Sequence, residues 1–147
     1  MTMKRHVLFY LYFGIIIFII SCTIGGSPRI RVEGVKFVTS SINRTASAFM
    51  LIINDGNGND TLIGCSVKDL PSAQCELHDF VNGRMQKVEG INIPAKEIIA
   101  LKRGGLHLML FNLPDRLGNG VTLILIFKRV GKIEVELPVE HSEHIHH

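Results

Sequence analysis

The fold class is decided at residues 121–137, VTLILIFKRVGKIEVEL, where two apolar stretches of strand length flank a short turn. In the second stretch, apolar and charged residues alternate, which is the period of a strand with one buried face. The residues expected on that face are Ile133, Val135 and Leu137. The first stretch is apolar on both faces, so we expect a central strand that is covered on both sides. Together they predict β structure around a shared core.

The rest of the chain continues this pattern, with strand-length runs separated by turn residues and no sustained helical period. The expected strands are 30–38, 46–54, 61–67, 73–81, 84–89, 97–102, 106–111, 121–129 and 132–139. Several short strands with one apolar face favour two packed sheets over an open sheet. We therefore predict an all-β fold, a β-sandwich, over residues 30–139.

Composition limits the classes of function. The chain has 147 residues with 46% hydrophobic residues and 14 glycines, as suits a single turn-rich globular domain. Basic residues occur singly or in pairs, without the clustered stripe that phosphate binding requires, so we expect no nucleic-acid partner. We expect a monomer.

The first 21 residues are typical of a secretory signal peptide, because Lys4 and Arg5 precede an apolar run from residue 7 to residue 20. A small residue, Ser21, then precedes Cys22, which resembles a bacterial lipobox. Cys22 is the expected lipidation site, residues 22–29 a tether, and the domain lies on the periplasmic face of the bacterial cell envelope, anchored to the membrane by lipid. The alternative is an uncleaved N-terminal anchor helix.

The strongest hairpin signal is the dipeptide Asn82-Gly83, which favours a two-residue type I′ turn. This register pairs residue 81 with 84, residue 80 with 85, and residue 78 with 87. Since side chains alternate with a period of two, His78 and Met85 are expected on the same face, as diagonal neighbours.

A second hairpin is expected to turn at residues 103–105, Arg-Gly-Gly. Its outgoing strand has leucine at positions 106, 108 and 110, which we assign to the core. His107 and Met109 then lie on the opposite face, roughly 7 Å apart at about 3.3 Å per residue. If the two hairpins are adjacent, two imidazoles and two thioethers converge.

These four side chains have a shared chemical preference. Thioether sulfur suits Cu(I), and imidazole accepts copper in either oxidation state, whereas hard cations need carboxylates that this set lacks. The alternative is that each methionine fills the core and each histidine is an isolated surface group. The joint pattern His-x6-Met-x21-His-x-Met, formed by His78, Met85, His107 and Met109, favours the metal site.

In this pattern the sequence resembles the periplasmic copper chaperones called PCu(A)C, of which it looks like a lipoprotein-type member. The resemblance covers residues 30–139, including ELH at 76–78, VEG at 88–90, IPA at 93–95 and LKRGGLHLML at 101–110. It implies a cupredoxin-like Greek-key β-sandwich that binds Cu(I) and delivers copper to a partner, such as the CuA centre of cytochrome c oxidase or an assembly factor.

One departure concerns the spacing, because the family has His-x10-Met where this chain has six residues between His78 and Met85. The shortened hairpin keeps side-chain parity, since the difference is an even number of residues. It leaves open the distance from His78 to the other three side chains.

Two further groups carry metal or redox chemistry. Cys65 and Cys75 are expected on neighbouring strands of a protein in an oxidising compartment, where they form either a disulfide or a thiol copper site, although their spacing matches no Cys-x-x-Cys pattern. The tail at residues 140–147 is expected to capture metal as an auxiliary site, or else to be an end with incidental affinity. Its histidines are His141, His144, His146 and His147.

Two rival functions stay open. A lipid-anchored sandwich can serve as a structural or adhesion module without a metal, since such folds have many functions. An enzyme is disfavoured because the sequence has no nucleophile elbow, phosphate loop or paired catalytic carboxylates. A copper chaperone is the function that the residues favour.

Overall fold

A computed structural model describes residues 25–40 and 43–138 and shows ten strands in these ranges. The strands are β1 Ile30–Ser40, β2 Thr45–Asn54, β3 Asp60–Val67, β4 Gln74–Val81, β5 Arg84–Lys87, β6 Ile91–Ile93, β7 Ile98–Leu101, β8 His107–Phe111, β9 Gly120–Phe127 and β10 Gly131–Pro138. Neither range contains a helix long and apolar enough to cross a membrane. Cys22 and the four tail histidines lie outside the described residues.

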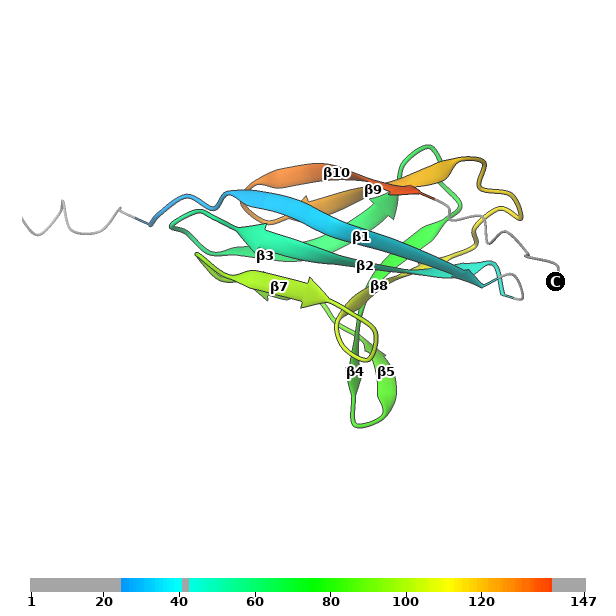
Figure 1. Ribbon diagram of the computed structural model, residues 1–147, viewed down its shortest axis with the longest axis horizontal. Coiled ribbons are helices and arrows are strands. Elements are labelled where there is room, and N and C mark those ends of the chain that lie inside the picture. Colours follow the sequence, from blue (N-terminus) through cyan, green and yellow to red (C-terminus); the bar gives the residue numbers. More distant parts are fainter. Residues whose placement is uncertain (1–24, 41–42, 139–147) are drawn as a thin grey trace, which may run out of the picture.

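The strands form two antiparallel sheets that pack face to face (Figure 1). One sheet has the order β1-β2-β8-β4-β5, with β7 also paired to β2, and the other has the order β10-β9-β3-β6. The predicted all-β sandwich is confirmed, and each of the nine expected strands is present. The sequence did not reveal β6, because three residues are too few to show alternation.

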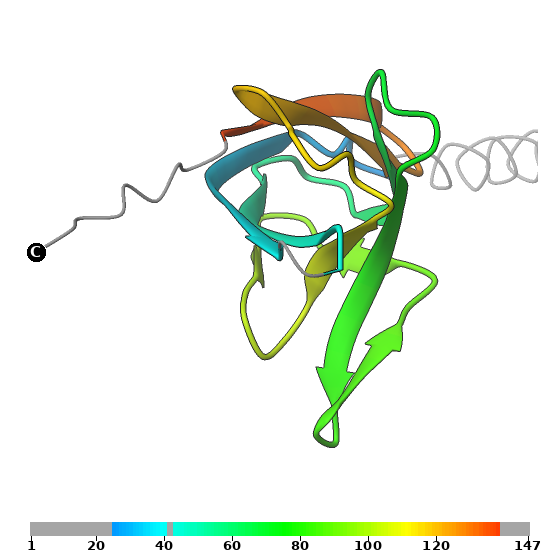
Figure 2. The ribbon, with the colours of Figure 1, turned by 90° about the vertical axis from the view of Figure 1, so that its right-hand side faces the viewer.

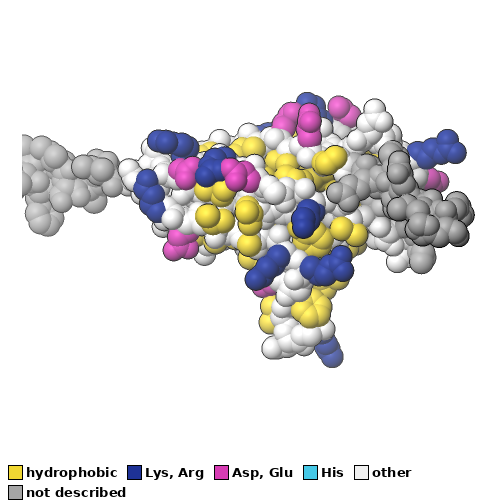
Figure 3. Space-filling view, in the orientation of Figure 1, with side chains coloured by type: hydrophobic (Ala, Val, Ile, Leu, Met, Phe, Trp, Pro, Cys, Tyr) yellow, Lys and Arg dark blue, Asp and Glu magenta, His cyan; other side chains and the backbone are white. Residues whose placement is uncertain are grey.

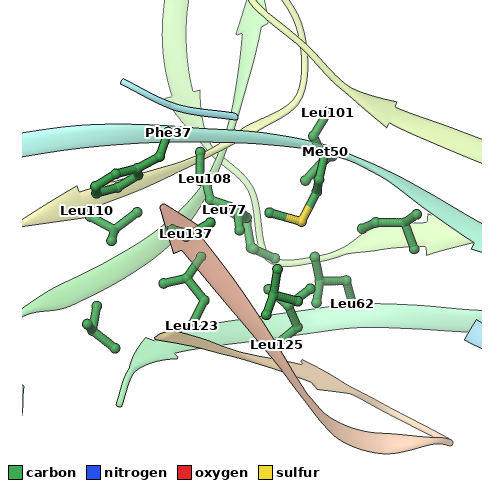
Figure 4. Close-up of a cluster of buried hydrophobic side chains, with 14 of the residues drawn as sticks. Phe37, Met50, Leu62, Leu77, Leu101, Leu108, Leu110, Leu123, Leu125 and Leu137 are labelled. Atoms are coloured by element: carbon green, nitrogen blue, oxygen red, sulfur yellow. The ribbon is translucent and has the colours of Figure 1, made fainter. Parts of the chain in front are cut away.

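The core lies between the sheets and is made of the inward side chains of both (Figure 4). Leu123 and Leu125 of β9 are fully buried, and so are Leu108 and Leu110 of β8. The inward face predicted for β10 is confirmed for its last two positions, since Val135 and Leu137 are buried, while Ile133 packs at the edge of the core.

The double covering expected for residues 121–127 is wrong. Strand β9 is internal to its sheet, between β10 and β3, but only alternate residues are fully buried. The other face of β9, at Thr122, Ile124 and Ile126, is half-exposed. The sandwich has two layers in its described part, so no third layer packs on this face. The isoleucines there are explained by the preference of β-branched residues for strands and not by burial.

The hairpin at Asn82-Gly83 has the predicted register, with Val81 opposite Arg84, Phe80 opposite Met85, and His78 opposite Lys87. Both turn residues have positive φ, 51° at Asn82 and 75° at Gly83, as a type I′ turn requires. The hairpin extends from the body of the sandwich as an arm, which Figures 1 and 2 show from two sides.

The predicted second hairpin is wrong, because β7 and β8 do not pair with each other. Both pair antiparallel with β2, on the same edge: Leu101 lies opposite Met50, and Leu108 opposite Ala48. Between them residues 102–106 leave this edge as a loop, closed by the Lys102 N–H bond to the Leu106 carbonyl at 2.8 Å. The ten residues of β2 are long enough to pair with both segments in turn.

Two internal connections tie the layers and turns together. Cys65 of β3 and Cys75 of β4 form a disulfide between the two sheets, with their Cα atoms 5.4 Å apart. The buried carboxylate of Asp60 accepts hydrogen bonds from the backbone N–H groups of Thr61, Arg129 and Val130, at 2.8–2.9 Å. Asp60 therefore holds the start of the turn between β9 and β10 against β3.

Candidate metal site

Two histidines face each other across the pair formed by β4 and β8. His78 lies directly opposite His107 in the register, and their ring centroids are 5.8 Å apart. Both rings are on the outer face of the sheet, because their strand neighbours Leu77 and Leu108 belong to the core. We call this outer surface around His107 the site face. The shortened hairpin therefore keeps His78 next to His107.

The hydrogen bond of His107 fixes which ring nitrogen carries the proton. Its Nδ1 lies 2.7 Å from the Gly105 carbonyl oxygen, which can only accept, so Nδ1 donates. Nε2 then carries the lone pair that a metal can use. The ring is held firmly, since His107 is only 6% exposed and packs against Phe49, with ring centroids 6.2 Å apart.

His78 has the opposite tautomer. Its Nε2 lies 3.0 Å from Oε2 of Glu76, and the neighbouring oxygen of this carboxylate accepts a hydrogen bond from Lys87 Nζ at 3.0 Å. A carboxylate accepts, so Nε2 donates and Nδ1 has the lone pair. This Nδ1 is buried and has no hydrogen-bond partner among the described residues. A buried lone pair without a partner is unfavourable, and a metal ion would satisfy it.

The two methionines lie on the same face as the histidines. Met109 is two residues from His107 on β8, and its sulfur accepts a hydrogen bond from the Ser47 hydroxyl at 3.1 Å. Met85 is on the arm, opposite Phe80, and its side chain is 51% exposed. Met85 is therefore turned outward, not into the core.

A cavity of about 380 Å³ opens beside this group of side chains. Met85 and His107 both line the cavity, and Ser47, the partner of Met109, lines it too. Its other lining residues are Val38, Phe49, Phe80, Arg103 and Gly104. His78 and Met109 do not line the cavity, but in the register His78 lies opposite His107, and Met109 lies opposite Ser47. The structure thus brings the four predicted residues to one region.

Three charged side chains lie at the site: Glu76, its partner Lys87, and Arg103. The hydrogen bond from His78, followed by that from Lys87, lowers the pKa of Glu76 below its ordinary value, so this carboxylate is ionised at neutral pH. Arg103 is the one charged residue among those that line the cavity. The four candidate ligands are neutral, so the charges at the site are those of these neighbouring side chains.

The donor set is two imidazoles and two thioethers, which suits Cu(I) and disfavours Mg²⁺ and Ca²⁺. Nowhere in residues 25–40 and 43–138, this site included, are three histidine, cysteine, aspartate or glutamate side chains placed to bind a metal ion together, so a metal here needs the thioethers. Cys65 and Cys75 are joined to each other and do not offer thiolates.

Sequence reasoning missed the side chains that support this site. Glu76 is two residues before His78, and an i, i+2 spacing on a strand places both on one face. That spacing was available as a signal for a carboxylate partner of His78. Ser47 and Arg103 gave no such signal, because Ser47 comes from β2 and Arg103 from the loop after β7, and only the three-dimensional pairing brings them here.

Comparison with curated proteins returns no match. Among protein families, residues 30–139 match the model of the LpqE-like family, described as "Putative lipoprotein LpqE-like". This match covers well over half of the 147-residue chain.

The fold is similar to solved structures of PCuAC domains. The copper-bound PCuAC domain from PmoF2 superposes with a TM-score of 0.62 at 20% identity, over 78% of this chain and 97% of that chain. The apo PCuAC domain from PmoF1 gives a TM-score of 0.64 at 20% identity, over 78% and 98% of the two chains. The apo domain from PmoF2 gives 0.60 at 19% identity, over 83% and 98%. The expected cupredoxin-like Greek-key sandwich is thereby confirmed.

Proposed function

Because this chain belongs to the LpqE-like family, whose description is that of a lipoprotein, and has the fold of PCuAC domains, we propose that it is a Cu(I)-binding metallochaperone of the cell envelope. In this proposal, His78, Met85, His107 and Met109 bind copper. The copper is cargo, and the protein delivers it to a copper-accepting partner, such as the CuA centre of cytochrome c oxidase or an assembly factor.

The observation that carries the proposal is the pair of histidines on β4 and β8. Each ring donates one N–H to a fixed oxygen, Gly105 O for His107 and Glu76 Oε2 for His78. Each ring therefore keeps one nitrogen lone pair, and that of His78 is buried with no hydrogen-bond partner in the described part of the chain. Histidines that bind metals are commonly held through the other ring nitrogen in this way, by a carbonyl or a carboxylate.

The sulfurs select the oxidation state. Thioethers are soft ligands that favour Cu(I) over Cu(II), and four neutral ligands leave a complex of charge +1. Arg103 at the cavity adds a second positive charge nearby, which disfavours Cu(II) more than Cu(I) because the repulsion scales with the charge of the ion.

Transfer proceeds by ligand exchange. Met85 is half-exposed on the arm, whereas His107 is buried and Met109 is held by Ser47. Met85 is therefore the ligand that an incoming donor atom of the acceptor replaces first. The copper stays Cu(I) throughout, so one bond to sulfur breaks as one bond to the acceptor forms, and no electron moves.

The location follows from the N-terminal region. We propose that Cys22 carries the lipid and that residues 22–29 connect it to the sandwich, with the site on the periplasmic face of the membrane. We also propose that the protein acts as a monomer. A chaperone at this position acts within reach of membrane-bound acceptors. The tail histidines would add an auxiliary capture site.

The proposal is tested by anaerobic Cu(I) competition between the full chain and a chromogenic chelator. The double variant Met85→Leu with Met109→Leu is expected to lose more than about 10-fold in Cu(I) affinity. A loss of about 10-fold is already typical when a residue that only hydrogen-bonds to a metal ligand is replaced, and here two ligands are removed. Met50→Leu is the matched control, because Met50 is a buried core residue. X-ray absorption of the Cu(I) form should count two sulfur and two nitrogen ligands, and replacing the four tail histidines by alanine should not change that count.

Two results would refute the proposal: no Cu(I) binding at micromolar competition, or a double variant that binds as tightly as the Met50→Leu control. In either case a lipid-anchored structural or adhesion module would remain.

A further inference from the structure

The wall of the cavity carries an unusual amount of exposed apolar surface. Val38, Phe80 and Met85 all line it, and their side chains are 45%, 45% and 51% exposed. Large apolar side chains that are gathered and exposed mark interaction sites more often than isolated ones do. Methionine and aromatic residues are also enriched in protein interfaces.

The same surface is positively charged. Arg103 lines the cavity, and Lys36 lies opposite Phe49 in the pairing of β1 with β2, so its side chain shares the face of the cavity-lining Phe49. We call Lys36 and Arg103 the rim cations. Neither takes part in an ion pair among the described residues. Figure 3 shows dark blue side chains beside yellow ones where the arm leaves the body, while most magenta ones lie in the upper and left parts of the view.

Negative charge on this face is already neutralised. Glu76 is the acidic residue that shares it with His78, and both of its oxygens are engaged, one by His78 and one by Lys87. Asp79 follows His78 on β4 and so lies on the other side of the arm. The positive charge of the rim cations is therefore not compensated by this carboxylate, and it attracts anionic groups that approach the cavity.

We propose that this surface is the docking face for the copper acceptor, and that it selects a protein whose own metal site is surrounded by carboxylates. The inference rests on the proposed function and adds the chemistry of the partner. Opposite charges steer the encounter and orient it, and the apolar contacts at Val38, Phe80 and Met85 stabilise the complex once water is excluded.

Two other occupants fit less well. A second copy of the chain would bring rim cations against rim cations, which like-charge repulsion disfavours. An anionic membrane surface is recognised by clusters of about four to eight Lys or Arg residues, whereas Arg103 is the one such residue among the described residues that line the cavity, and a flat surface does not fill this recess.

The test compares Cu(I) transfer from the copper-loaded full chain to two synthetic peptides. Both peptides contain the same Cys-x-x-Cys acceptor core and a fluorophore that Cu(I) quenches. One has glutamates on both flanks and the other has lysines. At low salt the glutamate peptide is expected to accept copper about 10-fold faster, and at high salt the two rates should become nearly equal, because screening removes the steering.

Variants then locate the effect. The double variant Lys36→Gln with Arg103→Gln should reduce the preference for the glutamate peptide to less than about 3-fold. The matched control is Lys128→Gln with Lys132→Gln, which changes the net charge by the same amount at exposed positions outside the site face. The control should keep the preference.

Three results would overturn the inference. The first is equal rates for the two peptides. The second is an equal loss of preference in both double variants, which would assign the preference to net charge. The third is a rim variant that keeps the preference yet loses binding to vesicles that contain phosphatidylglycerol, which would make this face a membrane contact. A chain that cannot be loaded with Cu(I) would instead refute the proposed function itself.

Discussion

Replacing Glu76 separates the role of the proposed copper ligands from that of the group that orients one of them, His78. The carboxylate lies 3.0 Å from His78 Nε2 and 3.0 Å from Lys87 Nζ, so it fixes both the tautomer and the direction of the His78 ring. Partners of this kind typically contribute 10- to 100-fold to metal affinity. Glu76→Gln keeps an oxygen acceptor but loses the charge, and hydrogen bonds to ionised groups are roughly twice as strong as neutral ones.

We therefore expect a graded loss of Cu(I) affinity, about 10-fold for Glu76→Gln and about 100-fold for Glu76→Ala, which also frees the ring to rotate. Competition against a Cu(I) chelator measures the affinity, and the Nε2 and Nδ1 nitrogen shifts of His78 in NMR spectra report the tautomer. Glu136→Gln is the control, since Glu136 is exposed on β10 in the other sheet. Affinities within twofold of wild type for both Glu76 variants would refute the orienting role.

Three further changes test the scaffold. Asp60→Ala removes the acceptor of three backbone N–H groups and should lower the unfolding free energy by about 2–4 kcal/mol. The control is Asp115→Ala at an exposed position, which should leave the unfolding free energy within about 0.5 kcal/mol of wild type. Urea unfolding that fails to distinguish the two variants would contradict the role of Asp60. Leu123→Ala opens a cavity at a fully buried site and should cost about 2–5 kcal/mol in the same assay; a loss below 1 kcal/mol would mean that the core there collapses around the gap. Because the pKa of Glu76 is lowered in the folded chain, its stabilising contribution is present above the ordinary carboxyl pKa of 4.5 and is lost as the pH falls through the lowered value. Thermal unfolding should therefore show a gap between wild type and Glu76→Gln at neutral pH that narrows as the solution is made acidic, and a gap that widens in acid would contradict this.

The sequence predicted the strands, the arm and its register because these depend on local information. Alternation fixes which residues face inward, and Asn82-Gly83 fixes the turn, so the relation of His78 to Met85 follows without knowledge of the rest of the fold. The proximity of His78 to His107 depends instead on β4 pairing with β8, and no local pattern specifies which strands become neighbours.

The error at residues 102–106 has the same origin. Two apolar runs flanking Arg103 and Gly104 favour a hairpin, yet β2 offers one continuous edge to both runs. Pairing with β2 satisfies the backbone groups of β7 and β8 on an internal strand of the sheet, and the loop is left to turn outward. Long-range pairing therefore overrode a local turn signal.

That loop has a consequence for how the protein can diversify. Since residues 102–106 depart from and return to one edge of β2, a side chain of this loop can change while Leu101 and Leu108 keep their positions against β2 and the Gly105 carbonyl keeps its bond to His107. Arg103 belongs to this insert, whereas His107 and Met109 belong to the strand. A substitution at Arg103 can therefore change the charge presented to a partner while the side chains of His107 and Met109 stay in place.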